Sequence, residues 1–245
     1  MENTGERFPH TRSTLLQQIQ SPDPETRNRA FGTLIQVYWR PVYGYLRLRW
    51  RRDRPDAEDL TQEFFLRAME GDYFERYDST IARFRTFLRT CLDGFMSNTA
   101  RAAGRQKRGG GNQVLSLDFD MAETDLAGVS IEGEAAMDRY FHQEWVRSVL
   151  TLSVTGLQNH CESHGKSFAF EIFSRYEIQA VEGDRPTYQE LARELNQPVT
   201  QVTNFLFYAR KEFRRIVLEI LRELTASEAE FQAEAEALLG IREGR

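Results

Sequence analysis

Residues 187–196 read TYQELARELN, and residues 197–213 continue as QPVTQVTNFLFYARKEF. The first segment carries apolar residues at helical spacing, and Thr187 with Glu190 matches the capping box that begins many helices. Pro198 lacks a backbone N–H and cannot simply continue that helix. The sequence therefore predicts a short helix, a turn of about four residues and a second helix.

The second segment predicts a longer amphipathic helix that begins near Thr200. Val202, Leu206, Ala209 and Phe213 recur at spacings of three and four residues, which places them on one face. Two helices joined by a short turn form a helix-turn-helix, whose second helix can enter the major groove of DNA. The same pattern also occurs in helix hairpins without a ligand, so on its own it leaves both readings open.

Helical periodicity also dominates the rest of the chain, and the alternation typical of strands is rare. Residues 105–111 read RQKRGGG, and such a run of glycines marks a domain boundary. Acidic residues with weak periodicity follow over 112–138, which indicates a flexible linker of low local order. We therefore predict an all-α chain of two helical domains, 1–111 and 139–224, joined by this acidic linker and followed by a helical extension over 225–245.

The net charge of −5 would disfavour a nucleic-acid partner if it were spread evenly along the chain. Residues 1–111, however, carry five more basic than acidic residues, whereas residues 112–186 carry eight more acidic than basic residues. Such segregation favours basic surfaces for an acidic partner, separated by an acidic spacer. Ordinary solvated surface would explain the same counts.

Composition and motifs also exclude several classes of protein. No run approaches the roughly 18 apolar residues of a membrane span, and the N-terminus lacks a signal-peptide pattern, so we expect a cytoplasmic protein without membrane insertion. His160, Cys161 and His164 have a weak metal spacing, but zinc would need a fourth ligand. The glycines at 109–111 lack the Lys-Ser/Thr of a phosphate-binding loop. We therefore expect no cofactor, no bound metal and no enzymatic activity.

Three further motifs carry a resemblance to a known family. Residues 57–66 read AEDLTQEFFL, preceded by YWRPVY at 38–43 and followed by FRTFL at 84–88. They resemble region 2 of sigma-70 family RNA polymerase sigma factors of the extracytoplasmic-function (ECF) type, and TYQELARELN resembles region 4 of the same family. The resemblance covers nearly the whole chain in the expected order. It implies a region 2 helical bundle within 1–111 and a region 4 helix-turn-helix within 139–224.

The AEDLTQEFFL motif contains the residues that the resemblance assigns to polymerase binding. Asp59, Gln62 and Glu63 stand at i, i+3 and i+4, so their polar ends share one face of a helix. The resemblance implies that this face docks on the β′ clamp helices of core RNA polymerase, and the family's second polymerase contact is the β flap. A solvated acidic helix N-terminus is the simpler alternative.

A second set of residues interleaves cations and aromatics, as binding of the promoter −10 element requires. Aromatic rings can stack on unpaired bases while Arg and Lys follow the phosphates. A buried aromatic face competes with this interpretation for Phe84, Phe87 and Phe95, and we expect at least two of these rings in the core. The residues predicted to bind the −10 element are Arg83, Phe84, Arg85, Phe87, Arg101, Arg105, Lys107 and Arg108.

The second helix of the helix-turn-helix supplies the residues predicted to bind the −35 element. Family members usually carry basic residues early in this helix, whereas aromatic and polar residues occupy that stretch here. Polar side chains there can still read base edges, but the aromatics also suit a protein-docking surface. The predicted set is Thr200, Gln201, Thr203, Asn204, Phe207, Arg210, Lys211 and Arg214.

The resemblance implies an alternative sigma factor that binds core RNA polymerase and promoter DNA. Such factors are commonly silenced by an anti-sigma or other inhibitor protein that fits between the two domains, and some are released by proteolysis, including in CRISPR-linked systems. Two other classes stay open. One is a DNA-binding regulator without polymerase contact, which would not need the AEDLTQEFF motif. The other is a sigma-like interaction protein whose region 4 docks a regulatory partner rather than DNA.

Overall fold

The computed structural model describes residues 15–71, 73–74, 76–78, 81–102, 117–180 and 185–240, and for residues 100–102 it describes the backbone alone. These residues form ten α-helices and one π-helical turn, without a strand among them, which confirms the predicted all-α class. The elements are α1 (Leu15–Ile19), α2 (Pro24–Leu48), α3 (Arg54–Glu70), α4 (Phe84–Ala102), α5 (Phe119–Leu126), α6 (Glu134–Ser163), α7 (Ser167–Phe173), η1 (Ser174–Ile178), α8 (Tyr188–Glu194), α9 (Val199–Leu224) and α10 (Glu228–Leu239).

Several helices begin at residues that satisfy the free N–H groups of a first turn. The Asp53 side chain accepts a hydrogen bond from the Asp56 backbone N–H at 2.9 Å at the start of α3. The Ser227 hydroxyl likewise accepts from the Glu230 N–H at 3.2 Å at the start of α10. Such caps fix where a helix starts and therefore which of its faces meets the core.

A large lobe is built around α2, whose apolar face packs against α1, α3, α4, α5 and the first half of α6. The same core also takes in the second half of α9 and the apolar side of α10. Its largest fully buried side chains include Tyr43, Tyr45, Phe64, Phe95 and Trp145. Helices from both ends of the chain therefore complete one core.

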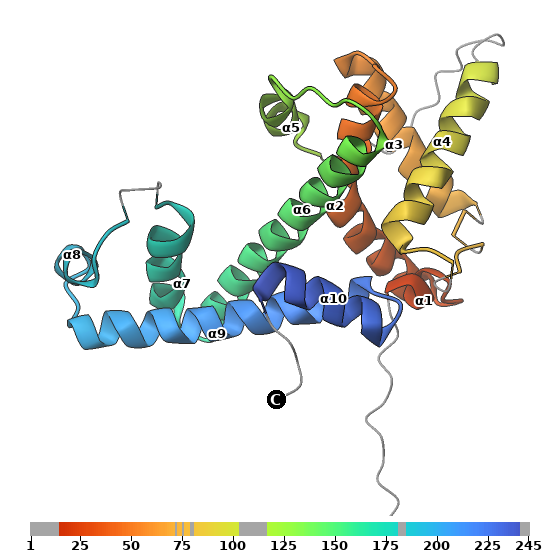
Figure 1. The fold of residues 1–245 in the computed structure, drawn as a ribbon. Helices are drawn as coiled ribbons and strands as arrows, with labels where there is room; N and C mark the ends of the chain where they lie inside the picture. The colour runs from red at the N-terminus through yellow and green to blue at the C-terminus, as the bar shows by residue number, and fades with distance from the viewer. Residues whose placement is uncertain are drawn as a thin grey trace, which may run out of the picture.

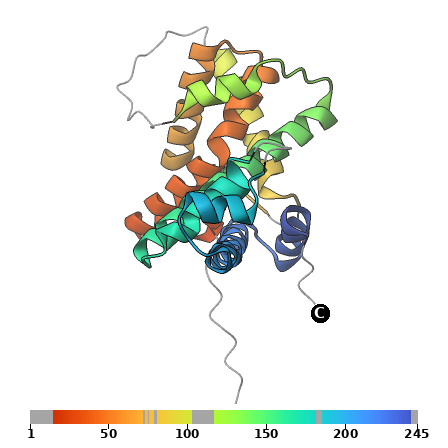
Figure 2. The same cartoon turned by 90° about the vertical axis from the view of Figure 1, so that its left-hand side faces the viewer.

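A small lobe is formed by α7, η1 and α8 together with the second half of α6 and the first half of α9. Its core contains Leu157 and Cys161 from α6, Ile172 from α7, Leu191 from α8 and Val202 from α9. Figure 1 shows α6 and α9 running from one lobe into the other, and Figure 2, turned by 90°, shows α9 almost end-on. Two continuous helices, rather than a loop, thus connect the lobes.

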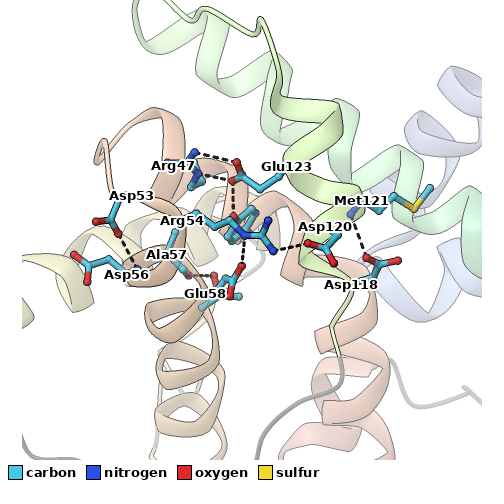
Figure 3. Close-up of polar contacts among 12 residues, drawn as sticks. Arg47, Asp53, Arg54, Asp56, Ala57, Glu58, Asp118, Asp120, Met121 and Glu123 are labelled. Atoms are coloured by element: carbon cyan, nitrogen blue, oxygen red, sulfur yellow. Dashed lines mark hydrogen bonds and ion pairs between the residues drawn. The ribbon is translucent and has the colours of Figure 1, made fainter.

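The acidic segment predicted to be a flexible linker is helical and docked over part of its described length. Residues 119–126 form α5, which packs against α2. Phe119 is 8% exposed, with its ring centroid 5.5 Å from that of Trp39 and 5.0 Å from that of Tyr43. Arginines of α2 and α3 pair with the acids of α5, so a charge pattern that indicated low order supplies docking contacts instead (Figure 3). The prediction of a flexible linker is therefore wrong for this part of 112–138.

Candidate polymerase and nucleic-acid interfaces

The outer face of α3 carries the three residues predicted to contact polymerase. The inner face of this helix packs into the large lobe through Phe64 and Phe65, which are fully buried. Asp59, Gln62 and Glu63 lie on the opposite side, where Asp59 is exposed and the other two are half-buried. Glu63 also forms an ion pair with Arg67 one turn later. The structure thus brings the predicted set together on one accessible surface.

The N-terminus of α3 is tied to α5 by charged side chains. Arg54 donates to Glu58 of its own helix at 2.7 Å and to Asp120 of α5 at 2.5 Å (Figure 3). Arg47, at the end of α2, donates to Glu123 at 2.5 Å and holds the pKa of that carboxyl below its usual range. The α5 acids therefore lie beside the N-terminus of α3 and compensate the charge of Arg47 and Arg54.

The aromatic residues at the start of α4 belong mostly to the core. Phe84 is 2% exposed and its ring centroid lies 5.5 Å from that of Tyr38 and 5.4 Å from that of Phe74. Phe95 is also buried, and Phe87 is half-buried against Tyr77. The expectation that at least two of the three phenylalanines are core residues agrees with this burial. The prediction that Phe84 binds the −10 element is wrong, because a ring enclosed on this scale cannot stack on a base.

The arginines of the same segment are paired with carboxylates. Arg83 and Arg85 both donate to Glu234 of α10, each at 2.7 Å. Arg89, one turn after Arg85, pairs with Glu134 and Asp138 at the start of α6. The described cations of the predicted −10 set, Arg83 and Arg85, are therefore paired within the chain. The side chain of Arg101, and Arg105, Lys107 and Arg108 altogether, lie outside the described residues.

The α8–α9 pair has the local geometry that the sequence predicts. The capping box is formed, with Thr187 N–H donating to the Glu190 carboxylate at 2.7 Å and Glu190 N–H donating to the Thr187 hydroxyl at 3.2 Å. Asn196 adopts a left-handed conformation with φ of 50°. Pro198 precedes the first residue of α9. The turn is therefore fixed by residues whose conformational preferences are local.

The outer side of α9 presents most of the residues predicted to contact the −35 element. Among the described residues of the small lobe, Phe207 is the most exposed large apolar residue, at 73%. Thr203 is half-buried and donates its hydroxyl hydrogen to the Thr200 carbonyl oxygen at 2.9 Å. Arg210 is exposed but donates to Glu177 at 2.7 Å. The exposed members of the predicted set are Thr200, Gln201, Asn204, Phe207, Arg210, Lys211 and Arg214.

The large lobe matches a known family. The protein-family model described as Sigma-70 region 2 matches residues 34–106, which include most of α2 and all of α3 and α4. The chain therefore contains a region 2 domain of the sigma-70 family. No curated protein matches it. The match confirms the resemblance stated for region 2, whereas the ECF type stays a prediction.

The sigma-70 region 2 domain supports a role for the chain in transcription initiation. Sigma region 2 implies binding of core RNA polymerase and of promoter DNA, and its family members are transcription factors rather than enzymes. Among the helices that the structure describes, none has the length and apolarity needed to cross a membrane. The α3 face and the basic start of α4 both lie within the matched region.

Some contacts at these surfaces could not be found from the sequence. Glu177, on the π-helical turn η1, accepts from both Arg210 and Arg185, and the Arg210 guanidinium lies 5.4 Å from the Tyr176 ring centroid. The ring of Tyr188 lies 5.2 Å from that of Tyr176. The sequence between η1 and α8 contains no motif that would predict these contacts. A π-helical turn such as η1 often marks a functional site. Glu234 was one acid among several in the C-terminal segment, and nothing local distinguished it.

Proposed function

We propose that this sigma-70 family member is an alternative sigma factor of the ECF type that directs core RNA polymerase to a dedicated set of promoters in the cytoplasm. The observation that carries the proposal is a second exposed surface: the same chain that contains sigma region 2 also presents an exposed polar and cationic face on α9. We assign the α8–α9 pair to region 4 as a helix-turn-helix, with the β flap as its polymerase contact. Core binding and promoter recognition then come from separate lobes.

The outer face of α3 is assigned to the β′ clamp helices of core polymerase. Asp59 is exposed, and no ion pair joins it to another residue in the described ranges. Exposed carboxylates contribute orientation and association rate at a protein interface more than they contribute affinity. A charge reversal on this face therefore opposes docking in addition to removing a contact.

The proposal is tested first by native co-purification of the chain with core RNA polymerase. The double variant Asp59→Lys and Glu63→Lys is expected to lose core binding with helix content unchanged, because both residues lie on the outer face. Its matched control is Glu162→Lys with Glu219→Lys, which makes the same charge change on exposed positions of α6 and α9. Normal holoenzyme assembly by the α3 variant would refute the region 2 docking face.

The leading turns of α9 are assigned to base reading in the −35 major groove. Gln201 and Asn204 are exposed there, and an amide side chain can make a bidentate contact with adenine. Lys211 and Arg214 continue the same exposed side and suit the flanking phosphates. Selection of bound promoters from a randomised library by the holoenzyme tests this assignment. Enrichment of a −35 motif supports it, and enrichment of a −10 motif alone contradicts it.

One observation favours a second candidate function, in which the small lobe docks a protein. Phe207 is 73% exposed in the middle of the face assigned to DNA, and a lone exposed aromatic of this kind is common at protein interfaces. An anti-sigma or other inhibitor protein would use it as an anchor, whereas DNA would offer it a thymine methyl. Phe207→Ala separates the two functions: loss of −35 affinity supports DNA contact, and unchanged DNA binding supports the docking surface.

A further inference from the structure

A buried carboxylate of α10 holds the arginines at the start of α4. Glu234 is 2% exposed, and its Oε1 accepts from Arg83 and from Arg85, each at 2.7 Å. The two arginines lie about 150 residues before Glu234 in the chain, inside the segment that matches sigma region 2. A C-terminal helix thus neutralises two cations of the DNA-binding region.

The position of Glu234 is enforced by the packing around it. Phe231 and Ala235 of α10 are buried in the large-lobe core, and the Arg222 guanidinium lies 4.2 Å from the Phe231 ring centroid. Burying a carboxylate is unfavourable unless it is paired and hydrogen-bonded. The two guanidinium groups supply that compensation, so docking of α10 and neutralisation of the arginines occur together.

The arginines also line a concavity that is open to solvent. A hollow of about 300 Å³ is lined by Arg83, Arg85, Arg89, Arg139 and His142, together with polar and apolar neighbours from α4 and α6. Arg89 is in turn paired with Glu134 and Asp138. Guanidinium forks bind carboxylate and phosphate oxygens with the same geometry. The carboxylates therefore stand where phosphates would bind a basic surface of this shape.

We propose that α10 is an intramolecular clamp, in which Glu234 takes the place of a DNA backbone phosphate on Arg83 and Arg85. The inference rests on the proposed function and on the role in −10 binding that the sequence predicts for Arg83 and Arg85. DNA binding at this surface requires Glu234 to release both guanidinium groups, so the docked α10 lowers the affinity of the chain for DNA. Removing the charge of Glu234 leaves the arginines available without a change in side-chain size.

The test compares the full chain with its Glu234→Gln variant for binding of a fluorescein-labelled 20-nucleotide single strand of mixed sequence. A mixed sequence suffices because phosphate contacts are independent of sequence. We expect the variant to bind about three- to tenfold tighter, with a salt dependence steeper by roughly one phosphate contact. The matched control Glu228→Gln removes one charge from the same helix at a residue that pairs with Arg222 instead. Circular dichroism establishes that all variants are folded.

A double-mutant cycle with Arg83→Ala identifies the route of the effect. If the gain passes through the released arginines, Glu234→Gln will add less in the Arg83→Ala background than in the wild-type background, because only Arg85 remains to be released there. No gain in the single variant, or an equal gain in both backgrounds, overturns the clamp. Core polymerase binding is measured separately on the same proteins. If the wild-type chain fails to bind core polymerase, the proposed function is contradicted. The comparison of single-strand binding then still decides whether α10 acts as a clamp.

Discussion

Replacing Phe119 by alanine tests whether α5 is an ordered part of the large lobe. The Phe119 ring is 8% exposed and packs against the rings of Trp39 and Tyr43. Buried Phe→Ala substitutions cost about 3–5 kcal/mol, and we expect the lower end, about 3 kcal/mol, because α5 is peripheral and its neighbours can close over the space. This free energy is lost from the docking of α5 on α2 rather than from the rest of the large lobe. It should raise the local opening equilibrium roughly a hundredfold, at about 1.4 kcal/mol for each factor of ten.

Hydrogen–deuterium exchange of peptides spanning residues 119–126 measures this opening directly. We expect protection of α5 in the wild-type chain and near-complete loss of that protection in Phe119→Ala, with α2 and α3 unchanged. Met121→Ala is the matched control, because Met121 lies on the same helix and is 57% exposed. Exchange of wild-type α5 at the rate of an unstructured peptide would refute the docked helix. Equal protection in Phe119→Ala would refute the role of the ring.

Three further predictions concern acid stability, packing and DNA reading. Arg47 lowers the pKa of Glu123 in the folded state, so this ion pair stabilises the docked α5 at pH values above the unfolded-state pKa. That stabilisation is lost as the pH falls through the folded-state pKa. Hydrogen exchange of α5 should therefore rise in acid, and it should rise less in Glu123→Gln. Gly44→Ala should destabilise the chain by about 1–3 kcal/mol in urea unfolding, because the new Cβ would overlap the ring of Tyr140. Asn204→Ala should relax preference at one −35 position by about 1–3 kcal/mol, whereas Arg214→Ala should weaken binding to all −35 sequences about equally and reduce its salt dependence.

The parts of the molecule that the sequence predicted well are those fixed by local preferences. The capping of α8 by Thr187, the turn at Pro198 and the inward face of α9 all depend on residues within a few positions of one another. The same holds for the outer face of α3, where helical spacing alone separates Asp59 from Phe64. The fold class and these two candidate surfaces were therefore accessible without coordinates.

The parts that were missed depend on partners far away in the chain. The acids of α5 indicated low order because their composition is polar, but Arg47 and Arg54 lie about 70 residues earlier and compensate them. Phe84 looked equally suited to a base and to a core, and only its burial under Tyr38 and Phe74 decided the matter. The pairing of Glu234 with Arg83 and Arg85 likewise joins residues about 150 positions apart, so local sequence did not predict it. Periodicity reports which face of a helix is apolar, and it is silent about what that face meets.

The contribution of α6, α9 and α10 to the large-lobe core affects how the protein folds during its synthesis. Residues from Leu15 to Phe95 supply one side of that core, and Phe231 and Ala235 supply part of the other. The ribosome must therefore deliver more than a hundred further residues before the apolar side of α2 is fully covered. Until then the nascent region 2 exposes surface that favours aggregation. A segment that ends at the glycines near residue 110 would lack these partners, so we expect region 2 of this sigma factor to fold late rather than first.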